Sequence, residues 1–133
     1  MHTKHLLSLG VLAALLSLAP LALADTFTYH FICDLDGAPP FTDVEDGRAT
    51  LDSETGDLTV KLSELQPNTT YTCVVSCQFN KAASAPCTTD RKGKLHAFLP
   101  GLGRSGALAT GCGYPNVTVF AGNDFCQNGY GQP

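Results

Sequence analysis

The six cysteines of this chain are the residues whose chemistry the sequence constrains most. They all follow a segment typical of an export signal, with Lys4 before an apolar run from Leu6 to Leu18 and a small-x-small cleavage site at Ala22-Leu-Ala24. An uncleaved anchor is the alternative, but Pro20 interrupts the apolar run. We therefore expect a signal peptide over 1–24 and one secreted, extracellular or periplasmic domain over 25–133. In an oxidising compartment we expect three disulfides among Cys33, Cys73, Cys77, Cys87, Cys112 and Cys126.

Five carboxylates gather in the segment 34–47, namely Asp34, Asp36, Asp43, Glu45 and Asp46. Calcium binds oxygen ligands, often carboxylates of a loop that a glycine turns, so this composition is compatible with a calcium site in an acidic loop. The spacing of these carboxylates departs from that of the twelve-residue calcium loop. Alternatively, they are ordinary solvated residues of turns, where Asp and Gly are common. Both interpretations stay open, and no other cofactor is expected.

His30 and His96 are the two histidines that remain after signal cleavage, and both lie on predicted strands, facing away from the core. Surface imidazoles are the simpler interpretation. A copper or zinc site, or a small metal-dependent hydrolase, would need the two histidines close together with further ligands such as Asp34 and Asp36.

The segment Gly101-Leu-Gly103-Arg-Ser-Gly106 matches the dinucleotide-binding glycine pattern. However, no helix pattern follows it and no βαβ unit surrounds it, so we predict a glycine-rich loop between strands. Ser105 lacks the flanking glycines of a nucleophile elbow. The sequence offers no credible nucleophile–base pair elsewhere, and we predict no catalytic residue.

Charge is divided unevenly along the chain, whose formal net charge is −4. Residues 25–64 hold ten carboxylates against Arg48 and Lys61, whereas residues 65–133 are net positive. A nucleic-acid-binding domain would carry net positive charge concentrated on one face, so the sequence argues against nucleic acid as a partner. No second apolar run of membrane length follows the signal. Asn68 and Asn116 begin N-glycan acceptor sequences, which matter only in a host that glycosylates secreted proteins.

Alternation of apolar and polar residues dominates the region after the signal. It predicts strands over 27–33, 49–51, 58–62, 71–77, 94–99 and 115–121, with Gly and Pro clusters between them. The turn cluster Asp52–Asp57 joins the second and third of these, so residues 48–62 are expected to form a β-hairpin. Six to seven short strands predict an all-β fold, namely a small disulfide-bonded β-sandwich, with a small closed barrel as the alternative.

The segment Leu65–Cys73 places Leu, Pro, Thr and Tyr at alternate positions, with Tyr71 two residues before Cys73. It resembles the tyrosine corner of immunoglobulin-like and fibronectin type III-like sandwiches. The resemblance implies an immunoglobulin-like β-sandwich in which the Tyr71 hydroxyl bonds to the backbone a few residues upstream. The chain departs from the family pattern because it has no tryptophan. The resemblance implies nothing about partners.

Disulfide connectivity is only partly constrained. Cys73 and Cys77 lie four positions apart on one predicted strand, or about 13 Å, whereas bonded cysteines have Cα atoms within about 7 Å. A Cys73–Cys77 bond is therefore excluded. The preferred set is Cys33–Cys73 between two sheets, because both lie on apolar strand faces, with Cys77–Cys87 and Cys112–Cys126. The other pairings stay open.

Our leading hypothesis is a non-catalytic secreted or periplasmic binding domain stabilised by three disulfides. Its function would lie in loops, such as the acidic 34–47 and glycine-rich 100–115 segments, or at a sheet edge. The alternatives are a metal-binding domain or small metal-dependent hydrolase, and a structural surface or matrix component. The sequence does not name the protein or glycan partner.

Overall fold

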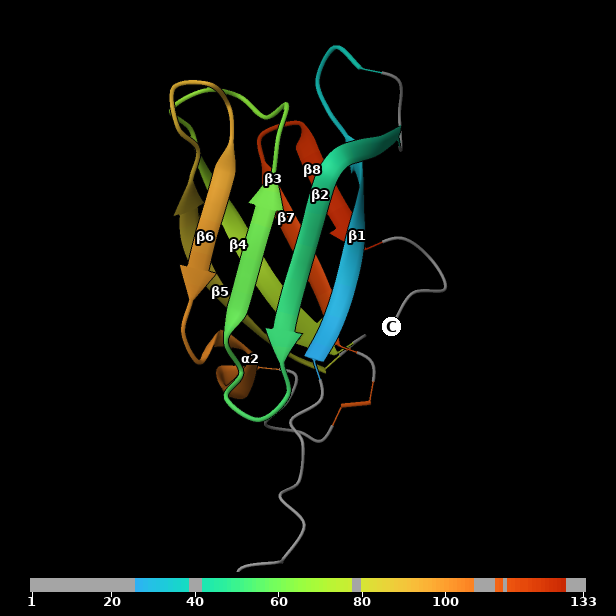
Figure 1. Ribbon diagram of the computed structural model, residues 1–133, viewed down its shortest axis with the longest axis vertical. Coiled ribbons are helices and arrows are strands. Elements are labelled where there is room, and N and C mark those ends of the chain that lie inside the picture. Colours follow the sequence, from blue (N-terminus) through green and yellow to red (C-terminus); the bar gives the residue numbers. More distant parts are fainter. Residues whose placement is uncertain (1–25, 39–41, 78–79, 107–111, 114, 129–133) are drawn as a thin grey trace, which may run out of the picture.

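The computed structural model describes residues 26–38, 42–77, 80–106, 112–113 and 115–128, and the expected signal peptide lies outside them (Figure 1). Within these residues the chain forms eight strands and one short helix. Their bounds are β1 Thr26–Asp34, β2 Thr42–Asp52, β3 Leu58–Leu62, β4 Thr70–Cys77, β5 Asn80–Thr88, β6 Leu95–Leu99, α2 Leu102–Ser105, β7 Asn116–Ala121 and β8 Asp124–Asn128.

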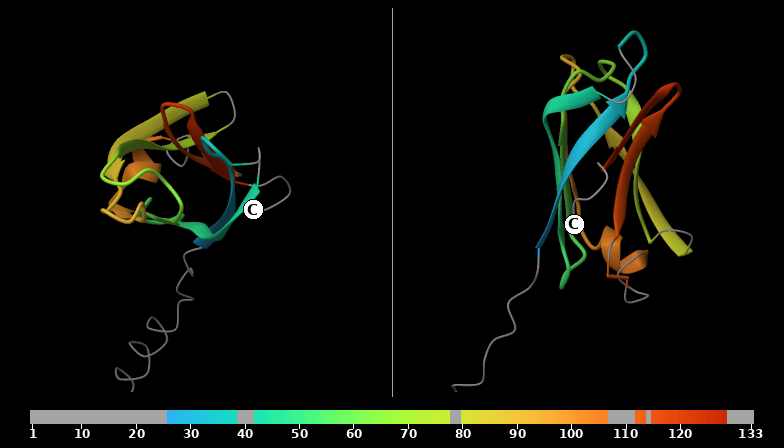
Figure 2. Two further views of the ribbon diagram at one scale, coloured as in Figure 1. Left: turned by 90° about the horizontal axis from the view of Figure 1, so that it is seen from above. Right: turned by 90° about the vertical axis from the view of Figure 1, so that its right-hand side faces the viewer.

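The eight strands form one antiparallel sheet in the order β5-β4-β7-β8-β1-β2-β3-β6. Seen from above, this sheet curls into a nearly closed ring whose two edges are β5 and β6 (Figure 2). The all-β prediction is confirmed. The sandwich of six to seven strands is not confirmed, because the described residues hold eight strands in one continuous sheet, which is closer to the barrel alternative.

Side chains from alternate positions fill the inside of the rolled sheet, as in a small barrel. On β1, Tyr29, Phe31 and Cys33 point inward and are buried, while Thr28 and His30 are exposed. The same period of two places Leu58, Val60 and Leu62 of β3 in the core. The fully buried large side chains include Tyr29, Phe31, Leu51, Leu58, Val60, Tyr71, Val75, Leu95, Val117 and Val119.

The predicted hairpin over 48–62 is confirmed, with Arg48 opposite Lys61 and Leu51 opposite Leu58. Its turn is held by the Asp52 carboxylate, whose Oδ1 accepts the backbone N–H groups of Glu54 at 2.8 Å and Thr55 at 2.9 Å. This local geometry fixes the register of β2 against β3.

Two strands were missed by the sequence analysis, β5 and β8. β5 reads NKAASAPCT, which is rich in alanine and contains Pro86, so it lacks the β-branched and aromatic residues that mark strands. Proline is tolerated there because β5 is an edge strand. β8 follows the last strand that the sequence predicted, and the two-residue loop Gly122-Asn123, with φ 56° at Gly122, joins it to β7.

The glycine-rich segment is a short helix, so the prediction of a loop there was wrong. α2 is tied to the β2–β3 turn by the Gly103 N–H, which donates to the Gly56 carbonyl at 2.8 Å, and by the Arg104 guanidinium, which donates to the Glu54 carbonyl. It lies at the end of the rolled sheet where that turn is found (Figure 1).

All six cysteines form disulfides, as predicted, and the excluded Cys73–Cys77 bond is absent. The preferred set was wrong, because the observed bonds are Cys33–Cys126, Cys73–Cys87 and Cys77–Cys112. That set assumed a bridge between two sheets. In a single rolled sheet the first two bonds instead join neighbouring strands, β1 to β8 and β4 to β5.

Candidate functional site

A row of basic side chains crosses four neighbouring strands on the outside of the sheet. His30 of β1 lies opposite Arg48 of β2, Arg48 opposite Lys61 of β3, and Lys61 opposite His96 of β6. All four are exposed, because their strands alternate and the residues beside them point into the core. We call these four residues the cationic row.

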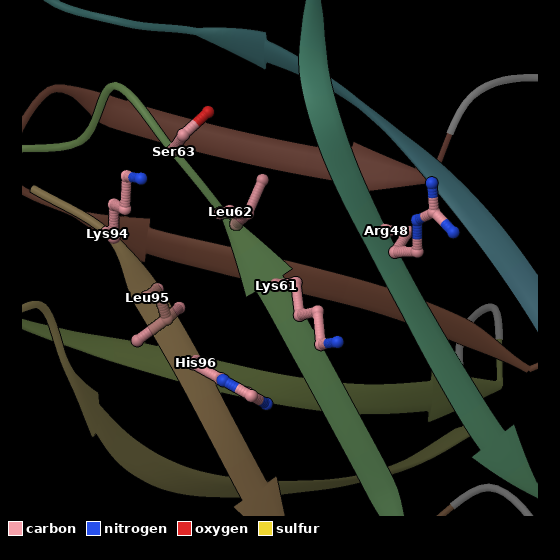
Figure 3. A pocket seen from close by; sticks show the side chains of 7 residues that line it. All are labelled: Arg48, Lys61, Leu62, Ser63, Lys94, Leu95 and His96. Atoms are coloured by element: carbon pink, nitrogen blue, oxygen red, sulfur yellow. The ribbon is translucent and has the colours of Figure 1, made fainter.

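Three of the four members of the cationic row, Arg48, Lys61 and His96, line a hollow of about 400 Å³. Its described lining residues include three permanent cations and one imidazole, and none of them is a carboxylate: Arg48, Lys61, Leu62, Ser63, Lys94, Leu95 and His96. Figure 3 shows the Lys61 and His96 side chains extending in a similar direction from β3 and β6, whereas the Arg48 side chain on the neighbouring strand β2 points away from them. The volume lies in the range of small-molecule sites in proteins.

Within the part of the chain that the structure describes, the charges of this hollow are poorly balanced. Like charges directly opposite each other on neighbouring strands destabilise a sheet, and Arg48 and Lys61 are such a pair. Among the described residues, neither side chain forms an ion pair or hydrogen bond. Lys94 differs, because Asp90 is close by: the backbone N–H groups of Lys94 and Lys92 hold the pKa of Asp90 below its usual value, and the two lysine charges lower it further.

Chemically, the hollow can hold an anion. A guanidinium presents paired N–H donors that match the oxygens of a carboxylate, phosphate or sulfate, and an ammonium adds a compact charge. Among the described residues, the lining also holds one hydroxyl, that of Ser63, and one imidazole, that of His96, beside the three cations.

A second hollow, of about 290 Å³, lies where Tyr71 meets the β7–β8 turn. The Tyr71 hydroxyl donates to Asp124 Oδ2 at 2.6 Å and accepts the Gln66 backbone N–H at 3.0 Å. The other oxygen of Asp124 accepts the Asp36 N–H at 2.9 Å. Burial and the bond to Asp124 raise the pKa of Tyr71 to about 12.

This second arrangement ties elements together rather than offering a reactive group. Tyr71 and Asp124 are both almost completely buried. Their side chains bond to each other, and they also accept the backbone N–H groups of Gln66 and Asp36. The bond from Gln66 to Tyr71 is the upstream backbone contact that the sequence analysis expected, while the contact with Asp124 was not foreseen. The immunoglobulin resemblance itself stays a prediction.

The five carboxylates of the predicted acidic loop do not share one loop. Asp34 ends β1 and Asp36 lies in the following turn, whereas Asp43, Glu45 and Asp46 lie on β2. The side chains of these last three are outside the described part of the chain. Among the side chains that are described, no group of three or more His, Cys, Asp or Glu residues could hold a metal ion. Calcium binding stays a prediction without support from these contacts.

The two histidines are not brought together, so the prediction of a shared copper or zinc site has no geometric support. His30 and His96 lie on strands separated by β2 and β3, about 14 Å apart at the usual strand spacing. The cations Arg48 and Lys61 lie between them and would repel a metal ion.

Arg48, Lys61 and Lys94 were not identified from the sequence. The sequence did contain a signal for Arg48 and Lys61. In the predicted hairpin both residues point outward, and both lie four positions from the turn Asp52–Asp57, so they can be expected to face each other. The pairing of β3 with β6, which adds His96 and Lys94, joins residues more than thirty positions apart in the chain and has no local signal.

No family model, curated protein or solved structure matches this chain. No helix in the part of the chain that the structure describes is long and apolar enough to cross a membrane. The function of the protein therefore has to be inferred from the residues of the site alone.

Proposed function

We propose that the protein is a non-catalytic binding domain of an oxidising compartment, extracellular or periplasmic, and that its ligand is anionic. The observation that carries the proposal is the opposed pair Arg48 and Lys61, which has no ionic partner among the described residues. A ligand with oxygen anions would convert this repulsive pair into a binding site. The three disulfides support the compartment, since such bonds persist where thiols are oxidised.

The test uses tripolyphosphate as a compact multivalent anion, with binding measured by isothermal titration calorimetry at low salt. The double variant Arg48→Gln/Lys61→Gln removes two charges from the hollow. The matched control Arg91→Gln/Lys92→Gln removes two exposed charges that do not line it. We expect the first variant to lose at least about tenfold in affinity and the control to stay near the wild type.

Equal weakening in both variants would mean that tripolyphosphate responds only to net charge, and it would overturn the proposal. Absence of binding to the wild-type protein would overturn it as well. Near-UV circular dichroism of each variant establishes that the fold is retained, which is expected because all four substituted side chains are exposed.

We also propose that the fold is related to that of immunoglobulin-like domains. The hydrogen bond between the Gln66 N–H and the Tyr71 hydroxyl supports it, because this is the contact that defines a tyrosine corner. The continuous sheet suggests a variation on that architecture in which the two sheets of a sandwich are merged along β1.

A further inference from the structure

A second row of residues lies next to the cationic row on the same outer face. Its members are successive cross-strand neighbours: Thr28 opposite Thr50, Thr50 opposite Thr59, and Thr59 opposite Phe98. Each lies two positions from a member of the cationic row, which places the rows about 7 Å apart. The face therefore combines hydroxyl groups, cations and one phenyl ring.

Phe98 is the most exposed large apolar side chain among the described residues, with 60% of its surface accessible. It lies on β6, an edge strand of the sheet. A single exposed apolar side chain is common on protein surfaces, so Phe98 matters here because of its neighbours. It lies opposite Thr59 and two positions from His96 of the cationic row, so a ligand bound along that row could also contact the ring.

Building on the function proposed above, we propose that the anionic ligand is a polysaccharide carrying sulfate or carboxylate groups. A sugar ring has an apolar face of C–H groups that can lie flat on Phe98, which removes apolar surface from water. Its hydroxyl groups can bond to the threonine hydroxyls, which donate and accept. Its charged substituents fit Arg48, Lys61 and Lys94.

The dimensions favour a chain over a single small anion. The cationic row extends over four strands, which at the usual spacing is about 14 Å. A lone phosphate or sulfate reaches one or two of these side chains, whereas a polymer with repeated charges can contact the whole row. Such a chain would cross the strands, with the row of threonines along one side.

Two other polyanions fit this face less well. An acidic peptide supplies charges but no flat ring for Phe98. Single-stranded nucleic acid stacks successive bases on several aromatic side chains, and Phe98 is the one phenyl ring on the described outer face of these four strands.

The experiment compares four immobilised probes: heparin, polygalacturonate, poly-glutamate and a thymidine oligonucleotide. Neutral dextran serves as the uncharged reference. Binding of the mature protein is measured by surface plasmon resonance at two salt concentrations. We expect heparin or polygalacturonate to bind at least about tenfold more tightly than poly-glutamate and the oligonucleotide.

Variants then locate the contact. Phe98→Ala should weaken polysaccharide binding about fivefold or more, while binding of poly-glutamate stays unchanged. Phe125→Ala is the matched control, because Phe125 is also exposed but lies on β8, away from the cationic row. Arg48→Gln/Lys61→Gln should weaken binding of every anionic probe.

The possible results distinguish the polysaccharide assignment from the proposed function, which is binding of an anionic ligand. If poly-glutamate or the oligonucleotide binds as tightly as the polysaccharides, or if Phe98→Ala behaves like Phe125→Ala, the polysaccharide assignment is wrong while anion binding stands. If no anion binds, tripolyphosphate included, both proposals are wrong.

Discussion

Replacing Tyr71 by phenylalanine removes one oxygen atom and keeps the buried ring. That oxygen takes part in two hydrogen bonds, one donated to Asp124 Oδ2 at 2.6 Å and one accepted from the Gln66 N–H at 3.0 Å. Tyr71 is 1% exposed and Asp124 is 4% exposed. Phenylalanine would leave a buried carboxylate oxygen and a backbone N–H without this partner.

The expected loss follows from these two bonds. A hydrogen bond to a charged group contributes roughly 1.5–3 kcal/mol and one between neutral groups roughly 0.5–1.5 kcal/mol, so Tyr71→Phe should cost about 2–4.5 kcal/mol. A domain of this size has a total stability of about 5–15 kcal/mol. The change should lower the urea midpoint by roughly 1–3 M.

Urea unfolding of the oxidised protein, followed by far-UV circular dichroism, measures this loss. Tyr29→Phe is the matched control, because the Tyr29 hydroxyl is also buried but donates one bond, to the Pro115 carbonyl at 2.8 Å. The control should cost only about 0.5–1.5 kcal/mol. A midpoint for Tyr71→Phe equal to or above that of Tyr29→Phe would refute the reasoning, and the corner would then have no special role.

Three further predictions concern charge, pH and covalent bonds. Lys61→Glu should raise stability by about 0.2–1 kcal/mol, because it turns the like-charged pair with Arg48 into an opposite pair, and the same variant should lose anion binding; a lower urea midpoint would contradict this. Tyr71 ionises near pH 10.0 in the unfolded chain and near 12 when folded, so its contribution is complete below pH 10 and lost as the pH rises toward 12; melting temperatures should fall over that range, and less steeply in Tyr71→Phe. Replacing both cysteines of Cys33–Cys126 by alanine, which opens a 93-residue separation, should cost about 4.6 kcal/mol, against about 3.0 kcal/mol for the 14-residue separation of Cys73–Cys87; equal unfolding midpoints for the two variants would argue against the loop-entropy explanation.

Local features of the fold were predictable from the sequence because neighbouring residues determine them. The β2–β3 hairpin follows from a turn cluster between two alternating segments, and the bond between Tyr71 and Gln66 spans only five residues. β8 could have been found from the Gly122-Asn123 pair, which is typical of a two-residue hairpin loop. β5 could not, because its residues favour a strand only through their pairing with β4.

Long-range pairing was not predictable, and the cysteines demonstrate the reason. Cys33 and Cys73 share the inward phase of their strands, which made them natural partners, yet their strands are separated by β8 and β7 in the sheet. Cys33 lies directly opposite Cys126, with 4.1 Å between the Cα atoms. Alternation determines which face a cysteine occupies, whereas the order of strands determines which cysteine it meets.

The same distinction explains the cationic row and what it implies for binding. Arg48 and Lys61 cannot move apart by a change of register, because a shift of one residue would expose Leu51, Leu58 and Val60 to water. The core therefore holds the backbone positions of Arg48 and Lys61 opposite each other, so any repulsion between them is a cost of folding rather than of binding. Under the proposed function, an anion that enters the hollow would relieve that repulsion as it binds, so part of the cost of bringing the two cations together is already met on folding.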